Sequence, residues 1–356
     1  MSSGAPPGRV VIKIGTSSLM SEGLPDPAKL DALADAVVRL RAGGVRPVLL
    51  GSGAIAAGEA LLKGAGGPSA HGRQLAAAVG QGVLFDGFRR ALSARGLVAA
   101  QILLTPLDLT LPEHRDSARA VVEESLAHGL VPVVNENDAV MVRNNDVLAA
   151  LLAASLGADR LLLLTDVPGL FGSDPRHDAD ARLVPEVPAM TPEVERLAGL
   201  TARGLGTGGM SAKLCAAWIA SLAGVPTVIA GADGPDVVER ATAGEPVGTL
   251  VHPRAPGKEP DLGRLWRSLG TPPAGRLVCR PEAVAAVRDG GPLTAGHCLA
   301  GEGGFAADAV VDVTVPGHGV IARGRTRADH TAVSGGHHPA GTPVIPHSDY
   351  VSFLEA

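Results

Sequence analysis

The hydrophobic positions of the first 255 residues form two kinds of segment that alternate along the chain. Short, nearly continuous apolar runs predict buried β-strands at 10–14, 45–50, 97–104, 130–134, 160–165 and 225–230. Longer segments rich in alanine and leucine predict helices at 27–42, 73–95, 117–128 and 147–156. Strands that alternate with helices predict a mostly parallel open sheet covered on both faces. The predicted fold class is therefore α/β.

Beyond residue 255 the pattern changes to shorter segments. Residues 254–275 contain four prolines and four glycines, which predicts a linker at 256–273 with a short helical turn. After it, short β-like runs separated by glycine turns are typical of a small barrel. We therefore expect an α/β domain at 1–255 and a small β-barrel-like domain at 274–356.

Composition excludes several classes of protein. The formal net charge of −5 gives no general attraction to nucleic acid or to an anionic membrane. The start of the chain lacks the apolar run of a signal peptide, and the most apolar segment, 147–158, is too short to span a bilayer. The three cysteines (Cys215, Cys279 and Cys298) are scattered and odd in number, which argues against a disulfide framework or a metal cluster. We expect a cytoplasmic protein.

Lysine is rare in this chain, and two of its positions are unusual. Only five of the 31 basic residues are lysines. Lys13 lies inside an apolar run, where it needs a carboxylate or an anion unless its head group reaches solvent from the strand end. Lys213 closely follows the glycine-rich stretch 206–209, which indicates a phosphate site. Ala212 before this lysine departs from the P-loop pattern, and a mobile surface loop is the alternative.

Polar residues gather where predicted strands end. Ser52 comes shortly after the second predicted strand. Thr165 is the last residue of the fifth predicted strand, and Asp166 follows it directly. The segments 135–138 (Asn-Glu-Asn-Asp) and 144–146 (Asn-Asn-Asp) place seven amide or carboxylate residues within twelve positions. Ligands of parallel sheets bind beyond the carboxyl ends of the strands, so this pattern favours a site for a polar, charged small molecule. The alternatives are a serine N-cap, turn residues and a helix cap at Asp146.

Histidines in the tail suggest a metal site at first sight. They are His330, His337, His338 and His347. Their spacing matches no common ligand pattern, and no cysteine lies beside them, so we predict no metal site here.

Six motifs, taken in order, resemble the glutamate 5-kinases (gamma-glutamyl kinases) of the amino-acid kinase family. They are VVIKIGTSSL, GSGAIAAG, QLAAAVGQG, VPVVNENDAV, LLLLTDVPGLFGSDPR and GLGTGGMSAK. The tail, with its late GHH at 336–338, resembles a PUA domain. The resemblance covers nearly the whole chain. It implies the three-layer αβα sandwich of the amino-acid kinase fold and the ATP-dependent phosphorylation of the γ-carboxylate of L-glutamate to γ-glutamyl phosphate, which begins proline biosynthesis.

The resemblance also implies a role for each matching residue. Lys13 and Lys213 would contact the transferring phosphoryl group, and Asp146 would position both lysines. Residues that would hold ATP are Lys13, Thr165, Asp166, Thr207, Gly208, Gly209, Met210, Ser211 and Lys213. Residues that would hold glutamate are Ser52, Asp138 and Asn145, with Asn135 nearby. Mg²⁺ would be held mainly by ATP.

Three departures from the family pattern lie on the amino-acid side. Arg143-Asn144-Asn145-Asp146 stands where Gly-Asp-Asn-Asp is usual. The segment between Asp138 and Asn145 is shorter than usual and lacks its customary lysine, and Gly51 replaces a serine or threonine. They leave open a kinase for a glutamate analogue or a related amino-acid carboxylate. Because proline feedback would act near this segment, we predict weakened inhibition by proline.

The resemblance bears on partners as well. It implies a homo-oligomer, either a dimer or a tetramer. PUA domains elsewhere bind RNA, which makes an RNA-binding protein the alternative from another functional class. Residues 273–356 contain six arginines, no lysine and eight acidic residues, a charge of 6 − 8 = −2, and only Phe305, Tyr350 and Phe353 as aromatic residues. Nucleic-acid affinity depends on phosphate contacts and stacking platforms, so we predict no nucleic-acid partner.

Overall fold

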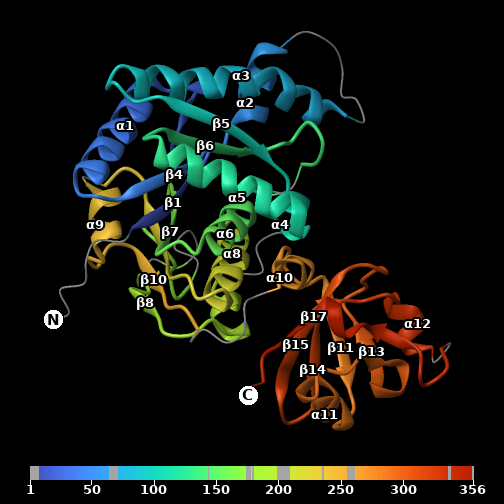
Figure 1. Ribbon diagram of the computed structural model, residues 1–356. Helices are drawn as coiled ribbons and strands as arrows, with labels where there is room; N and C mark the ends of the chain where they lie inside the picture. The colour runs from blue at the N-terminus through green and yellow to red at the C-terminus, as the bar shows by residue number, and fades with distance from the viewer. Residues whose placement is uncertain are drawn as a thin grey trace. The chain divides into compact units, whose positions relative to one another are not determined.

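The structure is a computed structural model that describes residues 8–63, 71–142, 144–173, 178, 180–198, 209–234, 236–254, 261–335 and 338–354. The chain divides into two compact units, Met1–Glu259 and Pro260–Ala356. Figure 1 shows helices around a sheet in the first unit and a smaller group of strands in the second. No helix in the described ranges is both long and apolar enough to cross a membrane.

An eight-stranded sheet forms the centre of the first unit. Its strands are β1 (Arg9–Ile14), β4 (Arg46–Leu50), β5 (Ala99–Leu104), β6 (Val131–Glu136), β7 (Arg160–Thr165), β8 (Glu186–Val187), β9 (Thr227–Gly231) and β10 (Thr249–Val251), in the order β5-β6-β4-β1-β7-β9-β10-β8. Neighbouring strands are parallel except β9 and β10. The six predicted strands and the mostly parallel sheet are confirmed. Because β6 runs further than predicted, Asn135 and Glu136 are buried strand residues.

Helices cover both faces of this sheet. One face carries α1 (Pro27–Ala42), α2 (Ala54–Leu61), α3 (Gly72–Ser93) and α9 (Val237–Ala243), which pack over alternate strand residues such as Ile12 and Ile14. The other carries α4 (Pro106–Thr110), α5 (Pro112–Ala127), α6 (Asn145–Leu156) and α8 (Met210–Leu222). Helix α5 begins five residues before its predicted start, because Pro112 is pre-organised for the first helical position. Shorter elements are β2 (Met20–Ser21), β3 (Leu24–Pro25) and α7 (Pro192–Arg196). The three-layer αβα sandwich is confirmed.

Helices α2 and α3 lie side by side (Figure 1), and two glycines allow their backbones to approach closely. A Cβ atom on Gly58 would lie 1.8 Å from the carbonyl oxygen of Ala76, and one on Gly80 would lie 1.9 Å from that of Ala54. Any side chain at either glycine would force the helices apart. Gly53, just before α2, has a φ of +126°, which favours glycine. Gly53 therefore allows the turn that connects Ser52 to α2.

The second unit is a small β domain, as predicted. Its strands are β11 (Gly275–Cys279), β12 (Leu293–Thr294), β13 (Cys298–Glu302), β14 (Val310–Val315), β15 (Gly319–Arg325), β16 (Pro343–Ile345) and β17 (Tyr350–Ser352), and its helices are α10 (Leu262–Leu269), α11 (Glu282–Arg288) and α12 (His330–Ser334). The described strands form a five-stranded sheet, in the order β13-β11-β14-β15-β17, and the pair β12-β16. The barrel-like shape and the likeness to a PUA domain stay predictions.

Part of the segment interpreted as a linker is a helix of this second unit. Helix α10 packs on β15 and β17. Leu262, Leu265 and Leu269 recur at helical spacing and are buried, and Arg267 donates a 3.0 Å hydrogen bond to Asp349. The high proline and glycine content around α10 concealed this apolar face.

Candidate active site

Two lysines share one buried carboxylate near the carboxyl end of the sheet. Lys13 of β1 places its Nζ atom 2.8 Å from Oδ1 of Asp146, and Lys213 of α8 places its Nζ atom 3.4 Å from Oδ2. The exposed fractions of Lys13, Asp146 and Lys213 are 4%, 0% and 3%. Lys13 therefore does not reach solvent, which excludes the alternative interpretation of this lysine. Lys213 is a buried residue of α8, whereas residues 206–208 of the glycine-rich stretch lie outside the described residues.

This triad has an excess of positive charge, because it joins two ammonium groups and one carboxylate. Burial by itself would raise the pKa of Asp146, but the charges of Lys13 and Lys213 outweigh this and hold the pKa below its ordinary value. Burial lowers the pKa of Lys213, and Asp146 opposes that shift. An excess of buried charge is costly unless an opposite charge joins it. The triad is therefore suited to an anionic group such as a phosphate.

A network of amide groups lies beside the triad. Asn145 donates from Nδ2 to Oγ of Ser52 at 3.2 Å and to Oδ1 of Asn135 at 3.0 Å. Its Oδ1 atom accepts a hydrogen bond from the backbone N–H of Glu136 at 3.1 Å. Asn135 in turn donates to Oε1 of Gln81 in α3 at 2.6 Å. The network brings together three predicted substrate residues from three different parts of the chain.

The first turn of α6 connects the triad to the network. Asn145 and Asp146 are consecutive, so their side chains leave the helix about 100° apart. The residue that caps this helix is Asn144, whose Oδ1 accepts a 2.8 Å hydrogen bond from the backbone N–H of Asp146. The cap of α2 is Gly53. Asp146 and Ser52 are therefore not the helix caps that the alternative interpretation of the sequence offered.

Asp138 lies just beyond β6, and only 8% of it is exposed. Burial raises its pKa to about 6, and the charge of Arg73 in α3 opposes the rise. Among the residues that the structure describes, no hydrogen bond joins its carboxylate to Ser52 or to Asn145. Because burial makes the charged form of this carboxylate costly, a bound cation such as an ammonium group would stabilise it.

The predicted nucleotide residues lie where β7 ends and α8 begins. Thr165, the last residue of β7, donates from Oγ1 to Oδ1 of Asp166 at 3.1 Å. Asp166 attracts Lys213 electrostatically, which connects this region to the triad. Gly209 is the N-cap of α8, and Met210 and Ser211 form its partly exposed start. Backbone N–H groups at such a start bind phosphates. Thr207 and Gly208 lie outside the described residues.

One departure from the family pattern has a structural explanation. A Cβ atom on Gly51 would lie 2.8 Å from Cε2 of Phe88, which is a buried residue of α3. The aromatic ring thus takes the space of the serine or threonine side chain that the resemblance leads us to expect. Arg143, part of another departure, lies outside the described residues.

Gln81 is a site residue that the sequence prediction missed. It lies on the face of α3 that also carries Ala77, Leu84 and Phe88 at helical spacing, and these three are buried. A polar side chain on such an apolar face needs a partner inside the protein. That mismatch is the signal that could have found Gln81.

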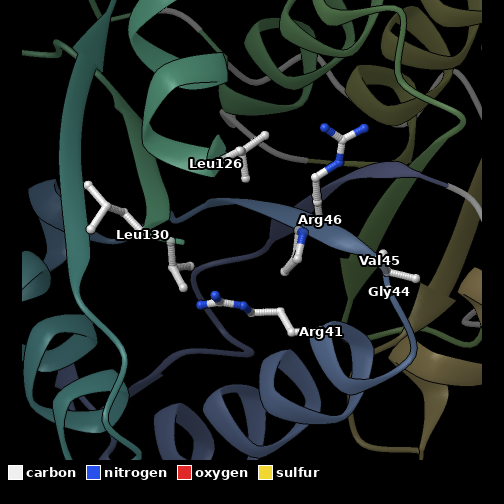
Figure 2. Close-up of a pocket in the computed structure, with 8 residues that line it drawn as sticks. Arg41, Gly44, Val45, Arg46, Leu126 and Leu130 are labelled. Carbon is white, nitrogen blue, oxygen red and sulfur yellow. The ribbon is translucent and has the colours of Figure 1, made fainter. Parts of the chain in front are cut away.

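A separate cavity of about 200 Å³ opens at the opposite end of the sheet. The residues that line it are Arg41, Gly44, Val45, Arg46, Pro47, Leu126, Leu130 and Val131. Arg46 and Val131 begin β4 and β6, whereas the triad lies near the strand ends. Figure 2 shows the guanidinium groups of Arg41 and Arg46 pointing in different directions, so they do not clamp one anion between them. This cavity is not part of the candidate active site.

Comparison with known proteins decides the family. The model of the amino acid kinase family matches residues 8–231. The chain belongs to the amino acid kinase family. Its relatives include the glutamate 5-kinases of Trichlorobacter lovleyi (38% identical, covering 89% of this chain and 86% of the relative), Gloeobacter violaceus (42%, 88% and 88%) and Carboxydothermus hydrogenoformans (38%, 96% and 94%).

Solved structures of two other kinases share the fold. The UMP kinase of Bacillus anthracis matches 70% of this kinase and 98% of its own chain, with a TM-score of 0.51 and 19% identity. The aspartate kinase of Synechocystis matches 72% of this kinase and 41% of its own chain, with a TM-score of 0.51 and 23% identity. The amino-acid kinase fold predicted for this kinase is confirmed.

Proposed function

We propose that this amino acid kinase acts in the cytoplasm and transfers the γ-phosphoryl group of ATP to the γ-carboxylate of L-glutamate, the first step of proline biosynthesis. The products are ADP and γ-glutamyl phosphate. The observation that carries the proposal is the buried triad of Lys13, Asp146 and Lys213 with its excess positive charge. Phosphoryl transfer requires alignment of the reactants and neutralisation of charge. The attacking carboxylate is already anionic, so no general base is needed. The glutamate 5-kinases among the relatives support this choice of substrate.

Glutamate is held by the amide network in this proposal. Ser52, Asn135 and Asn145 supply a hydroxyl and two amide groups for its polar atoms. Asp138, a buried carboxylate, accepts the α-ammonium group. Because Asn145 directly precedes Asp146, a substrate bound by Asn145 has its reacting end close to the two lysines.

ATP occupies the ends of β7 and α8 in this proposal. Its ligands are Lys13, Thr165, Asp166, Gly209, Met210, Ser211 and Lys213, together with Thr207 and Gly208. Within the described ranges, no three His, Cys, Asp or Glu side chains cluster as a metal site. Asp146 already pairs with two lysines, so the donor set fits a Mg²⁺ ion that takes its ligands mainly from the ATP phosphates. When bound, Mg²⁺ supplies further charge neutralisation at the phosphates.

Hydroxylamine trapping tests the reaction, because it converts an acyl phosphate to a stable hydroxamate. We expect hydroxamate only when ATP, Mg²⁺ and L-glutamate are all present. A preparation in which Lys213 is replaced by alanine serves as the inactive control. If ATP binds but no glutamate concentration gives hydroxamate, the glutamate assignment is wrong.

A second candidate is a kinase for a glutamate analogue or a related amino-acid carboxylate. The position of Phe88 favours it, because this ring occupies the space next to Ser52 that a side chain at position 51 would take. ADP release should be measured with glutamate, aspartate, 2-aminoadipate and glutarate at matched concentrations. A higher kcat/KM for another substrate than for glutamate would replace the first candidate with the second.

We also propose that the kinase forms a homo-oligomer, either a dimer or a tetramer. Strand β5 is at the edge of the sheet, and Leu103, Leu107 and Leu111 on and after it are 39%, 39% and 47% exposed. Sheet edges and apolar surface of this kind are commonly covered by a partner. Light scattering at micromolar concentration should give a multiple of the chain mass, and Leu107→Lys should reduce it. A monomer in the wild type would contradict the proposal.

Proline feedback in this proposal acts at the glutamate site and is weak. The short segment between Asp138 and Asn145 offers fewer contacts than the family usually has. Activity measured at a fixed glutamate concentration with increasing proline should fall only at high proline. Strong inhibition at low proline concentration would contradict this expectation.

The second unit supports assembly or regulation in this proposal, and it does not bind RNA. Phe305 and Tyr350 are only 2% and 3% exposed, so neither ring is available for stacking on a base. Full-length protein should show only weak association with a structured RNA, and moderate salt should abolish it. Tight, salt-resistant binding would restore the RNA hypothesis.

A further inference from the structure

Two of the three cysteines lie opposite each other in the second unit. Cys279 ends β11 and Cys298 begins β13, and the two residues are partners across this antiparallel pair. The register shifts between Val278 and Cys279, so this pair sits at an irregularity of the ladder. Paired residues of a regular antiparallel ladder have Cα atoms about 4.5–5.5 Å apart, and a disulfide spans about 4.4–6.8 Å. Both side chains pack into the same apolar cluster, so they lie on the same face of the sheet. In this structure both thiols are free.

The two thiols differ in environment. Cys279 is fully buried, whereas Cys298 is partly exposed and its Sγ donates to the carbonyl oxygen of Thr294 at 3.5 Å. The interaction between the two neighbouring thiols raises the pKa of Cys279 and lowers that of Cys298, although burial opposes the second shift. An accessible thiol with a lowered pKa next to a second thiol is the usual arrangement of a reactive and a resolving cysteine.

We propose that Cys279 and Cys298 form a redox-active dithiol that a hydroperoxide oxidises to an intramolecular disulfide. The Cys298 thiolate attacks the outer oxygen of the hydroperoxide, the O–O bond breaks, and an alcohol (or water, from hydrogen peroxide) leaves. This gives a sulfenic acid on Cys298. The Cys279 sulfur then attacks the sulfenic sulfur, and water leaves as the S–S bond forms. Overall, two thiols lose two electrons and two protons, and the hydroperoxide is reduced to one alcohol and one water.

The disulfide would join the edge strand to its neighbour. Strand β13 is the first strand of the five-stranded sheet and pairs only with β11 among the described strands of that sheet. The bond closes a loop that contains α11 and β12, and a loop closure of this size restricts the unfolded chain. Oxidation should therefore raise the unfolding temperature of the second unit, and a reducing agent should reverse the shift.

The test uses the full-length protein and hydrogen peroxide as the oxidant. After treatment and denaturation, the number of thiols that react with a maleimide should fall from three to one. Peptide mass spectrometry should find a linked pair that contains Cys279 and Cys298 and has lost two hydrogens. Cys215→Ser, which alters a buried cysteine of α8, is the matched control and should still lose two thiols. Dithiothreitol should restore all thiols.

Two variants separate the steps. Cys279→Ala should leave Cys298 as a sulfenic acid that dimedone captures, and Cys298→Ser should protect Cys279 from oxidation. Three reactive thiols after excess peroxide in the wild type would overturn the proposal. So would a disulfide between two chains, or accumulation of oxidised Cys298 without the linked peptide. If either variant fails to fold, the wild-type thiol count and the linked peptide decide the question by themselves.

Discussion

Asp138 should give glutamate binding a pH dependence that comes from the enzyme. Its carboxylate is buried, and burial raises its pKa to about 6. In the proposed complex the ionised carboxylate holds the substrate ammonium. The γ-carboxyl of glutamate titrates near pH 4.3 and its amino group stays charged below pH 7, so neither substrate group titrates around pH 6. Acidification through pH 6 therefore protonates Asp138 and removes its attraction for the substrate.

The size of the effect follows from this pKa. With a pKa of about 6, roughly nine-tenths of the carboxylate is ionised at pH 7 and one-tenth at pH 5. The value of kcat/KM for glutamate, which reports the free enzyme, should fall about tenfold between these two pH values. The value of kcat at saturating glutamate should change much less, because bound ammonium keeps Asp138 ionised.

The assay measures ADP release at saturating MgATP over pH 5–8, with glutamate varied at each pH. Asp138→Asn should lower kcat/KM at pH 7 by at least about tenfold, as loss of the charge does, and should flatten the profile. Asp116→Asn, at an exposed carboxylate of α5, is the matched control and should keep the wild-type profile.

Folding provides an independent readout for the same variant. A carboxyl whose folded pKa is raised binds more protons when folded, so it decreases stability as pH rises from about 4 through 6. Asp138→Asn should therefore fold at least as well as the wild type at pH 7, with a gain of up to about 3 kcal/mol in the free energy of unfolding. A flat wild-type profile between pH 5 and pH 7, or a tenfold step that survives in Asp138→Asn, would refute the reasoning.

Three further predictions concern residues of the triad, the network and the helix contact. Lys13→Ala and Lys213→Ala should each lower kcat by about 10²–10³, as loss of a preorganised donor does, whereas Lys63→Ala, at an exposed lysine, should not. Near-normal turnover in either triad variant would exclude the two-lysine mechanism. Gln81→Leu should raise the KM for glutamate more than it lowers kcat, because it frees the amide of Asn135 to rotate; an unchanged KM would remove Gln81 from the site. Gly80→Ala should lower the free energy of unfolding by about 3 kcal/mol or more, whereas Gly82→Ala, with open space around it, should be neutral or stabilising in denaturant titration.

The sequence by itself determined the class of fold and the location of the candidate site. Apolar runs and helical periodicity depend on burial of neighbouring residues, so they are visible locally, and all six strands followed from them. The same apolar runs identified Lys13 as a candidate site residue, because it is a charged residue inside one of them. The expectation that the polar segments meet followed from the parallel sheet, whose strands end at one edge.

The tertiary structure decided which of these residues meet and which further residues join them. Asp146 reaches both lysines because α6 packs against β1 and α8, which are far from it in the chain, and Asn145 of the same helix reaches Ser52. The segment around Gln81 indicates only that this polar residue lies on an apolar helix face, and the packing of α3 gives it Asn135 as its partner. Cys279 and Cys298 looked scattered in the sequence, yet the register of β11 and β13 places them opposite each other. Contacts of this kind depend on strand order and register, and these are set by the packing of the whole chain and not by any local pattern.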